Sequence, residues 1–139
     1  MRTAYLWFAL GLYLAFAVDH AIDVFVFEHH DPGVDPAAFY RTLLLIGIPI
    51  ALVSGLVFLL GLRTLRVPGL AQRLSVQAAS ALSGILVSAL MFCVAHLTER
   101  LWGAESTLAH TVAVGALLLL SAGGGALTAA LAGMRRPAL

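Results

Sequence analysis

Two pairs of histidine and acid residues, each near the end of an apolar segment, are the groups in this sequence best suited to chemistry. Residues 16–23 read FAVDHAID and residues 92–99 read FCVAHLTE, so both contain the pattern Phe-x-Val-x-His-x-x-acid. The pairs are His20 with Asp23 and His96 with Glu99. Residues three positions apart lie on one face of a helix, so each pair would present an imidazole and a carboxylate to the same point. The shared pattern predicts two repeated helical hairpins.

A metal ion is the first ligand that this chemistry suggests. Two such helices side by side would offer two imidazoles and two carboxylates, a mixture that suits zinc, iron, manganese or copper better than calcium. A di-iron centre would need more inward-facing carboxylates than the other segments supply, so a single ion fits better. The predicted metal ligands are His20, Asp23, His96 and Glu99, with Asp19 and His110 as further candidates.

A b-type haem is the second ligand that the two histidines allow. His20 and His96 on parallel helices could serve as its two axial ligands. Only one haem could be held in this way, so an electron path across a membrane would need a partner subunit. The leading prediction is therefore a metal or haem site that serves metal handling or electron transfer.

Two other hypotheses use the same residues without a bound metal or haem. Helix ends often carry ionisable groups that pair with one another, so the cluster could only stabilise an accessory subunit of a membrane complex. Ionisable groups within a membrane span, by contrast, usually mark a functional site, and Asp19 lies about three turns before its apolar segment ends. Asp19 or Asp23 could therefore be the titrating group of a small proton-coupled carrier. The sequence leaves open whether the chain is an enzyme.

The elements that must position these groups are four long apolar segments. The chain has 139 residues, of which 61% are hydrophobic and only 11% are charged. Crossing a membrane takes about 20 residues of helix, and each segment is close to or above that length. A helix also satisfies its own backbone polar groups in lipid. We predict one all-α transmembrane domain over residues 1–139, an up-down bundle of four helices at about 4–27, 42–62, 75–97 and 108–134.

Arginine placement predicts the orientation of this bundle. Six of the eight basic residues fall near the chain termini or between the second and third segments, on one predicted face. Positive residues favour the cytoplasmic side, so both termini are predicted to be cytoplasmic in a plasma or inner membrane, with the acids and histidines outside. The expected partners are the lipid bilayer and other membrane subunits or further copies of the chain. The arginines are too few and too close to the membrane for nucleic-acid binding.

The N-terminal segment has a second interpretation. Arg2, the apolar run that follows and the AFA sequence at residues 15–17 resemble a short signal peptide with its cleavage site. Cleavage there would leave three helices. The apolar character resumes after Asp23 as VFVF, which favours an intact span of about 24 residues.

Overall fold

Four long apolar helices make up the part of the chain that the structure describes. The structure is a computed structural model, and it describes residues 2–22, 24–25, 36–64, 74–103 and 106–133. The helices are α1 (Arg2–Ile22), α2 (Pro36–Thr42), the π-helical segment η2 (Leu43–Gly47), α3 (Ile48–Thr64), α4 (Val76–Trp102) and α5 (Thr107–Leu131). Because α2, η2 and α3 follow one another without a break, they form one span, Ala37–Thr64. Each of the four spans is long and apolar enough to cross a membrane, so the described residues form an all-helical structure that is compatible with a membrane helical bundle.

Two differences between the helix bounds and the prediction concern the second and third helices. Helix begins at Pro36 rather than near residue 42, because proline is well tolerated in the first turn of a helix. The third predicted helix, α4, continues past Glu99 and Arg100 to Trp102 and ends where Gly103 adopts a φ of 85°. Glycine takes this left-handed conformation without steric cost, and its N–H bonds to the Glu99 carbonyl oxygen.

The π-helical segment η2 ends two residues before a proline, Pro49, within the second span. Pro49 has no N–H to donate, so the regular pattern of α-helical bonds cannot continue through it. The Ile48 N–H bonds instead to the carbonyl oxygen of Leu43, five residues earlier. This wider turn is a known way for a helix to absorb an interruption.

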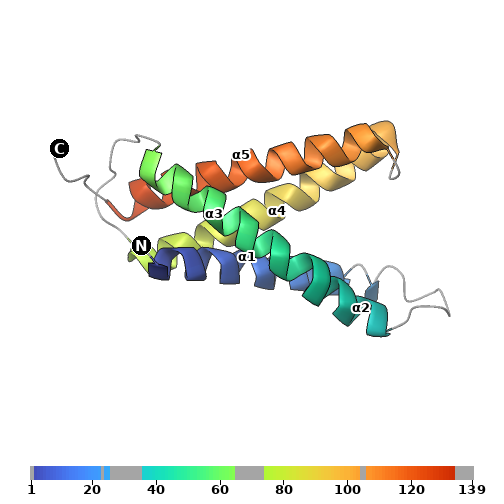
Figure 1. The fold of residues 1–139 in the computed structure, drawn as a ribbon, viewed down its shortest axis with the longest axis horizontal. Helices are drawn as coiled ribbons and strands as arrows, with labels where there is room; N and C mark the ends of the chain where they lie inside the picture. Colours follow the sequence, from blue (N-terminus) through green and yellow to red (C-terminus); the bar gives the residue numbers. More distant parts are fainter. Residues whose placement is uncertain (1, 23, 26–35, 65–73, 104–105, 134–139) are drawn as a thin grey trace.

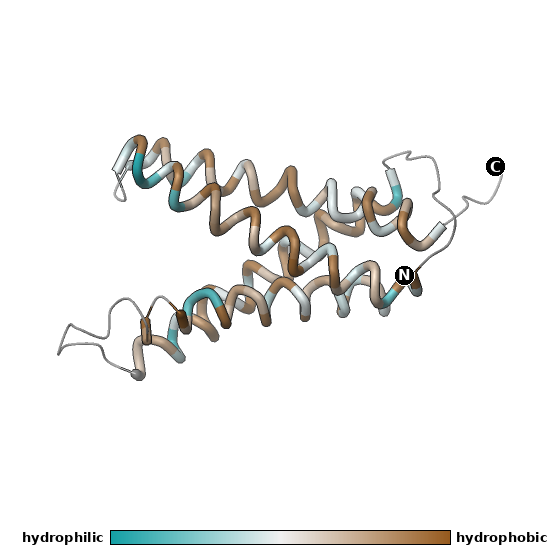
Figure 2. Tube along the Cα trace, turned by 180° about the vertical axis from the view of Figure 1, so that it is seen from behind, coloured by the Kyte–Doolittle hydropathy of each residue, from teal (hydrophilic) through white to brown (hydrophobic). Residues whose placement is uncertain are grey.

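The four spans are arranged as two helix pairs that diverge toward one end. In Figure 1, α1 and α4 start at the end where the N-terminus lies, and α3 and α5 run back toward it. Contacts join α1 to α4, α4 to α5, α3 to α5 and α1 to α3. We call the end at which α1 and α4 finish the distal end. There, α1 and α2 lie apart from α4 and α5 (Figures 1 and 2).

Glycines bring α1 and α4 into close backbone contact. A Cβ atom on Gly11 would collide with the Ala81 carbonyl oxygen, and one on Gly84 would collide with the Phe8 carbonyl oxygen. The contact is reciprocal, since each glycine meets the residue three positions before the other. Lipid supplies no hydrophobic force between helices, so such close approach is what holds them together.

The α3–α5 crossing repeats this arrangement. A Cβ atom on Gly61 would collide with the Ala122 carbonyl oxygen, and one on Gly125 would collide with the Phe58 carbonyl oxygen. The Phe58 ring stacks on the Phe8 ring with their centroids 4.2 Å apart, and both side chains are fully buried. This stack joins the two crossings at the centre of the bundle.

Hydroxyl groups tie α4 to α5 in the same region. The hydroxyl oxygens of Ser83 and Thr128 lie 2.9 Å apart, and the Thr128 hydroxyl also donates to the Ala79 carbonyl oxygen at 3.3 Å. Both side chains are fully buried. Such interhelical hydrogen bonds stabilise membrane bundles by roughly 0.6 kcal/mol each. The packed half of the bundle is thus held rigidly, and the diverging half beyond it can enclose a cavity.

Candidate functional site

A cavity of about 280 Å³ lies between α1, α3, α4 and α5. Most of its wall is apolar and includes the aromatic rings of Phe16 and Phe92. Its polar lining consists of Asp19 from α1 and Ser88, His96 and Glu99 from α4. The cavity therefore brings together one predicted pair, His96 with Glu99, and the further candidate Asp19.

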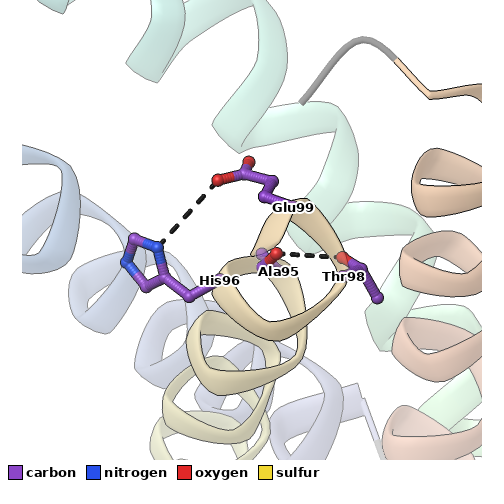
Figure 3. Close-up of polar contacts among 4 residues, drawn as sticks. All are labelled: Ala95, His96, Thr98 and Glu99. Atoms are coloured by element: carbon purple, nitrogen blue, oxygen red, sulfur yellow. Dashed lines mark hydrogen bonds and ion pairs between the residues drawn. The ribbon is translucent and has the colours of Figure 1, made fainter. Parts of the chain in front are cut away.

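The predicted pairing of His96 with Glu99 is present in the structure. The His96 Nδ1 atom lies 4.0 Å from the Glu99 Oε2 atom, and each side chain is about half exposed. Figure 3 shows both side chains leaving α4 on the side away from α5. The helix itself fixes this geometry, because residues three positions apart share a face.

Phe92 places an aromatic ring beside the imidazole. The ring centroids of Phe92 and His96 are 4.1 Å apart and the planes are nearly perpendicular, at 89°. This edge-to-face contact is a favourable geometry for aromatic rings. It fixes the His96 ring at the wall of the cavity.

Asp19 brings a second carboxylate to the cavity from the facing helix. It belongs to the last turn of α1 and is partly buried. It also lines a groove of about 600 Å³ between α1 and α4. Asp19 is therefore the acidic residue at the junction of the two spaces, within the span Thr3–Ile22.

His20 lies in a different environment from His96. Its ring stacks between Phe16, at a centroid distance of 6.0 Å, and Phe39 of α2, at 5.2 Å. His20 is not among the residues that line the cavity. Its Nε2 atom is buried and has no hydrogen-bond partner within the described residues.

The register of the α1–α4 crossing explains this separation. The reciprocal contacts of Gly11 and Gly84 make these glycines equivalent across the crossing. In that register His20 corresponds to Cys93, so His96 lies three residues further along its helix. The alignment of residues 16–23 with residues 92–99 by residue type therefore differs from the register in which the two helices pack. The predicted repeat stays a prediction.

The other predicted ligands do not join the cavity in the described structure. His110 is exposed near the start of α5, and its Nδ1 atom lies 2.9 Å from the Ser106 carbonyl oxygen. Asp23 lies outside the described residues. Across the ranges that the structure describes, no three His, Cys, Asp or Glu residues form a group that could hold a metal ion. The full metal-ligand set therefore stays a prediction, of which the structure assembles the pair His96 and Glu99.

Ser88 is a polar cavity residue that the site prediction missed. The sequence indicated it only as a small residue that allows close helix packing, in the series Ser80, Gly84 and Ser88. The spacing of residues could have identified Ser88. Ser88, Phe92 and His96 follow one another at four-residue intervals on α4, which places them on the same helix face. These three side chains share a helix face, and all three line the cavity.

No family assignment constrains what this cavity does. Comparisons with protein families, curated proteins and solved structures found no match for this chain. The chemistry of the cavity is therefore the basis for its function.

Proposed function

We propose that this protein is a small membrane carrier that binds an organic cation in the distal cavity and exchanges it for protons. The observation that supports this proposal is the meeting of Asp19, His96 and Glu99 in one largely apolar cavity between four membrane-spanning helices. Ionisable groups inside membrane bundles are costly and typically belong to substrate or proton pathways.

The size and lining of the cavity favour an organic ligand. Small-molecule sites are mostly apolar, contain a few placed polar groups and start at roughly 300 Å³. The cavity volume of about 280 Å³ lies near this lower limit. Two carboxylates favour a positive charge, and Phe16 and Phe92 supply aromatic rings at the cavity wall for cation–π contacts with an ammonium group.

The proposed orientation places the cavity on the outer side of the membrane. In the sequence, six of the eight arginines fall near the chain termini or between the second and third spans, so the end of the bundle where α1 starts is proposed to be cytoplasmic. The distal end then faces the outside of a plasma or inner membrane. A cation would enter the cavity from that side, and the carboxylates and His96 would exchange protons there.

A metal ion is the second candidate ligand, and the His96–Glu99 pair supports it. These two donor atoms are 4.0 Å apart, so a modest movement would let both bind one zinc, iron, manganese or copper ion. A third protein donor would have to come from Asp19 or from Asp23. The haem hypothesis gains no such support, because His20 packs against Phe39.

A ligand-binding experiment distinguishes the cation carrier from the metal-binding protein. Protein without a histidine tag would be placed in lipid nanodiscs and tested for saturable binding of radiolabelled tetramethylammonium, with bound metals measured by mass spectrometry. We expect stoichiometric ammonium binding that Glu99→Gln weakens by about tenfold, because a hydrogen-bonded or paired charge contributes about 1.5–3 kcal/mol. The control variant His110→Ala removes an exposed imidazole outside the cavity and should leave the affinity unchanged.

Transport is tested with the same probe. In proteoliposomes with an acidic interior, protons leaving through the protein should drive uptake of labelled tetramethylammonium. A stoichiometric metal that is lost in both His96→Ala and Glu99→Gln would instead establish the metal site and contradict the carrier. Protein that binds neither ligand would leave the cluster as a structural network of an accessory subunit.

A further inference from the structure

A groove on the surface of the bundle runs along the α1–α4 pair and has a volume of about 600 Å³. Its wall includes Leu14, Val18 and Ile22 of α1, which are 54%, 60% and 43% exposed. On the other side, Ile85, Ala89 and Cys93 of α4 contribute exposed side chains. These residues lie within two helices that are long and apolar enough to span a membrane, so in a bilayer the groove would face the hydrocarbon.

The groove and the cavity share part of their walls. Asp19, Ser88 and Phe92 line both spaces. Among the described residues that line the groove, Asp19 is the charged one. One bound molecule could therefore place a positively charged group at Asp19, where the two spaces meet, and an apolar tail along the groove.

We propose that this groove is a lateral entrance from the bilayer and that the ligand is a single-chain amphiphilic ammonium. Its charged head lies at Asp19 and reaches the cavity, and its hydrocarbon tail remains in the groove. This inference rests on the proposed function, because it requires that the cavity binds a cation.

The apolar wall of the groove and the carboxylate of Asp19 favour a single-chain ammonium over an uncharged lipid. A hydrocarbon tail needs no hydrogen bonds, and the groove offers an apolar wall apart from the Asp19 and Ser88 side chains. In a low-dielectric environment a carboxylate attracts an ammonium strongly, so a cationic head is held where a neutral head is not. Phe92 lies between the two spaces and presents a ring to the head.

Filling the groove tests this entrance. Ala89→Trp would place an indole in the groove, and Leu90→Trp is the matched control because Leu90 is 49% exposed on the same helix and does not line the groove. In nanodiscs, dodecyltrimethylammonium would compete with labelled tetramethylammonium for the site. We expect Ala89→Trp to weaken this competition at least tenfold while the direct affinity for tetramethylammonium stays unchanged. Leu90→Trp should change neither value.

The outcomes separate the entrance from the function on which it rests. If Ala89→Trp binds both ammonium ions as the unsubstituted protein does, the lateral entrance is wrong and the proposed function stands. If the unsubstituted protein binds neither ion, both proposals are wrong. If Ala89→Trp loses both ions, Val18→Trp on the α1 wall decides, because it fills the groove from the opposite side. Selective loss of the long-chain ion in that variant supports the entrance, and any other result overturns it.

Discussion

Asp19→Asn is expected to abolish measurable cation binding while the protein remains folded. Asparagine has nearly the same shape as aspartate, so the side chain can still occupy the junction of the cavity and the groove. The substitution removes a negative charge inside a membrane span, where electrostatic interactions are strong. We expect the affinity for tetramethylammonium to fall by roughly 100-fold, equivalent to about 2.7 kcal/mol.

Stability provides the control for this prediction. Asparagine keeps a carbonyl oxygen that can accept hydrogen bonds, and a charge within a span is costly, so the substitution is expected to leave the free energy of unfolding unchanged or raised. A structural ion network predicts the reverse, because it would lose a partner. Thermal unfolding followed by circular dichroism in mild detergent measures this. Marked destabilisation with unchanged cation affinity would contradict a ligand-binding role for Asp19.

Gly84→Leu is expected to disrupt the bundle itself. Any side chain at position 84 meets the Phe8 carbonyl oxygen and the Leu12 backbone nitrogen, and backbone atoms cannot move aside as a flexible side chain can. The α1 and α4 helices would have to separate, with loss of their main packing. We expect a destabilisation of at least about 3 kcal/mol, or failure to fold, as for other severe overpacking changes.

Gly115→Leu is the matched control for the crossing. Gly115 lies in α5, and a Cβ atom there would meet nothing within 4 Å. Leucine has a higher helix propensity than glycine by roughly 0.8 kcal/mol, so this variant should be neutral or slightly more stable. Equal unfolding temperatures for Gly84→Leu and Gly115→Leu would show that the α1–α4 contact does not hold the bundle together.

The four spans could be predicted from sequence because length and hydropathy alone determine them. Bounds were predicted less well where helices extend beyond the apolar segment. The second helix was expected to begin near residue 42, yet the chain is helical from Pro36 onward. Glu99 and Arg100 ended the apolar pattern, although charged residues are tolerated in the last turns of a helix that reaches the membrane surface.

Only the part of the candidate site that lies on a single helix could be predicted from the sequence. His96 and Glu99 share a face of α4 because of the helical repeat, and their spacing in the sequence was enough to show it. The position of His20 depends on how α1 is rotated against α4. The close contacts at Gly11 and Gly84 set that rotation. A comparison of residue types between two apolar segments gives no information about the rotation.

Photo-crosslinking tests the central claim, that the distal cavity holds a cation, most directly. A trimethylammonium probe carrying a small diazirine would be irradiated with the protein in nanodiscs, and labelled residues would be identified by mass spectrometry. We predict saturable labelling of cavity residues such as Phe16, Met91 and Leu117, which tetramethylammonium prevents. Labelling confined to exposed positions outside the cavity, such as Leu45 and Leu119, or labelling that excess tetramethylammonium does not reduce, would contradict the account.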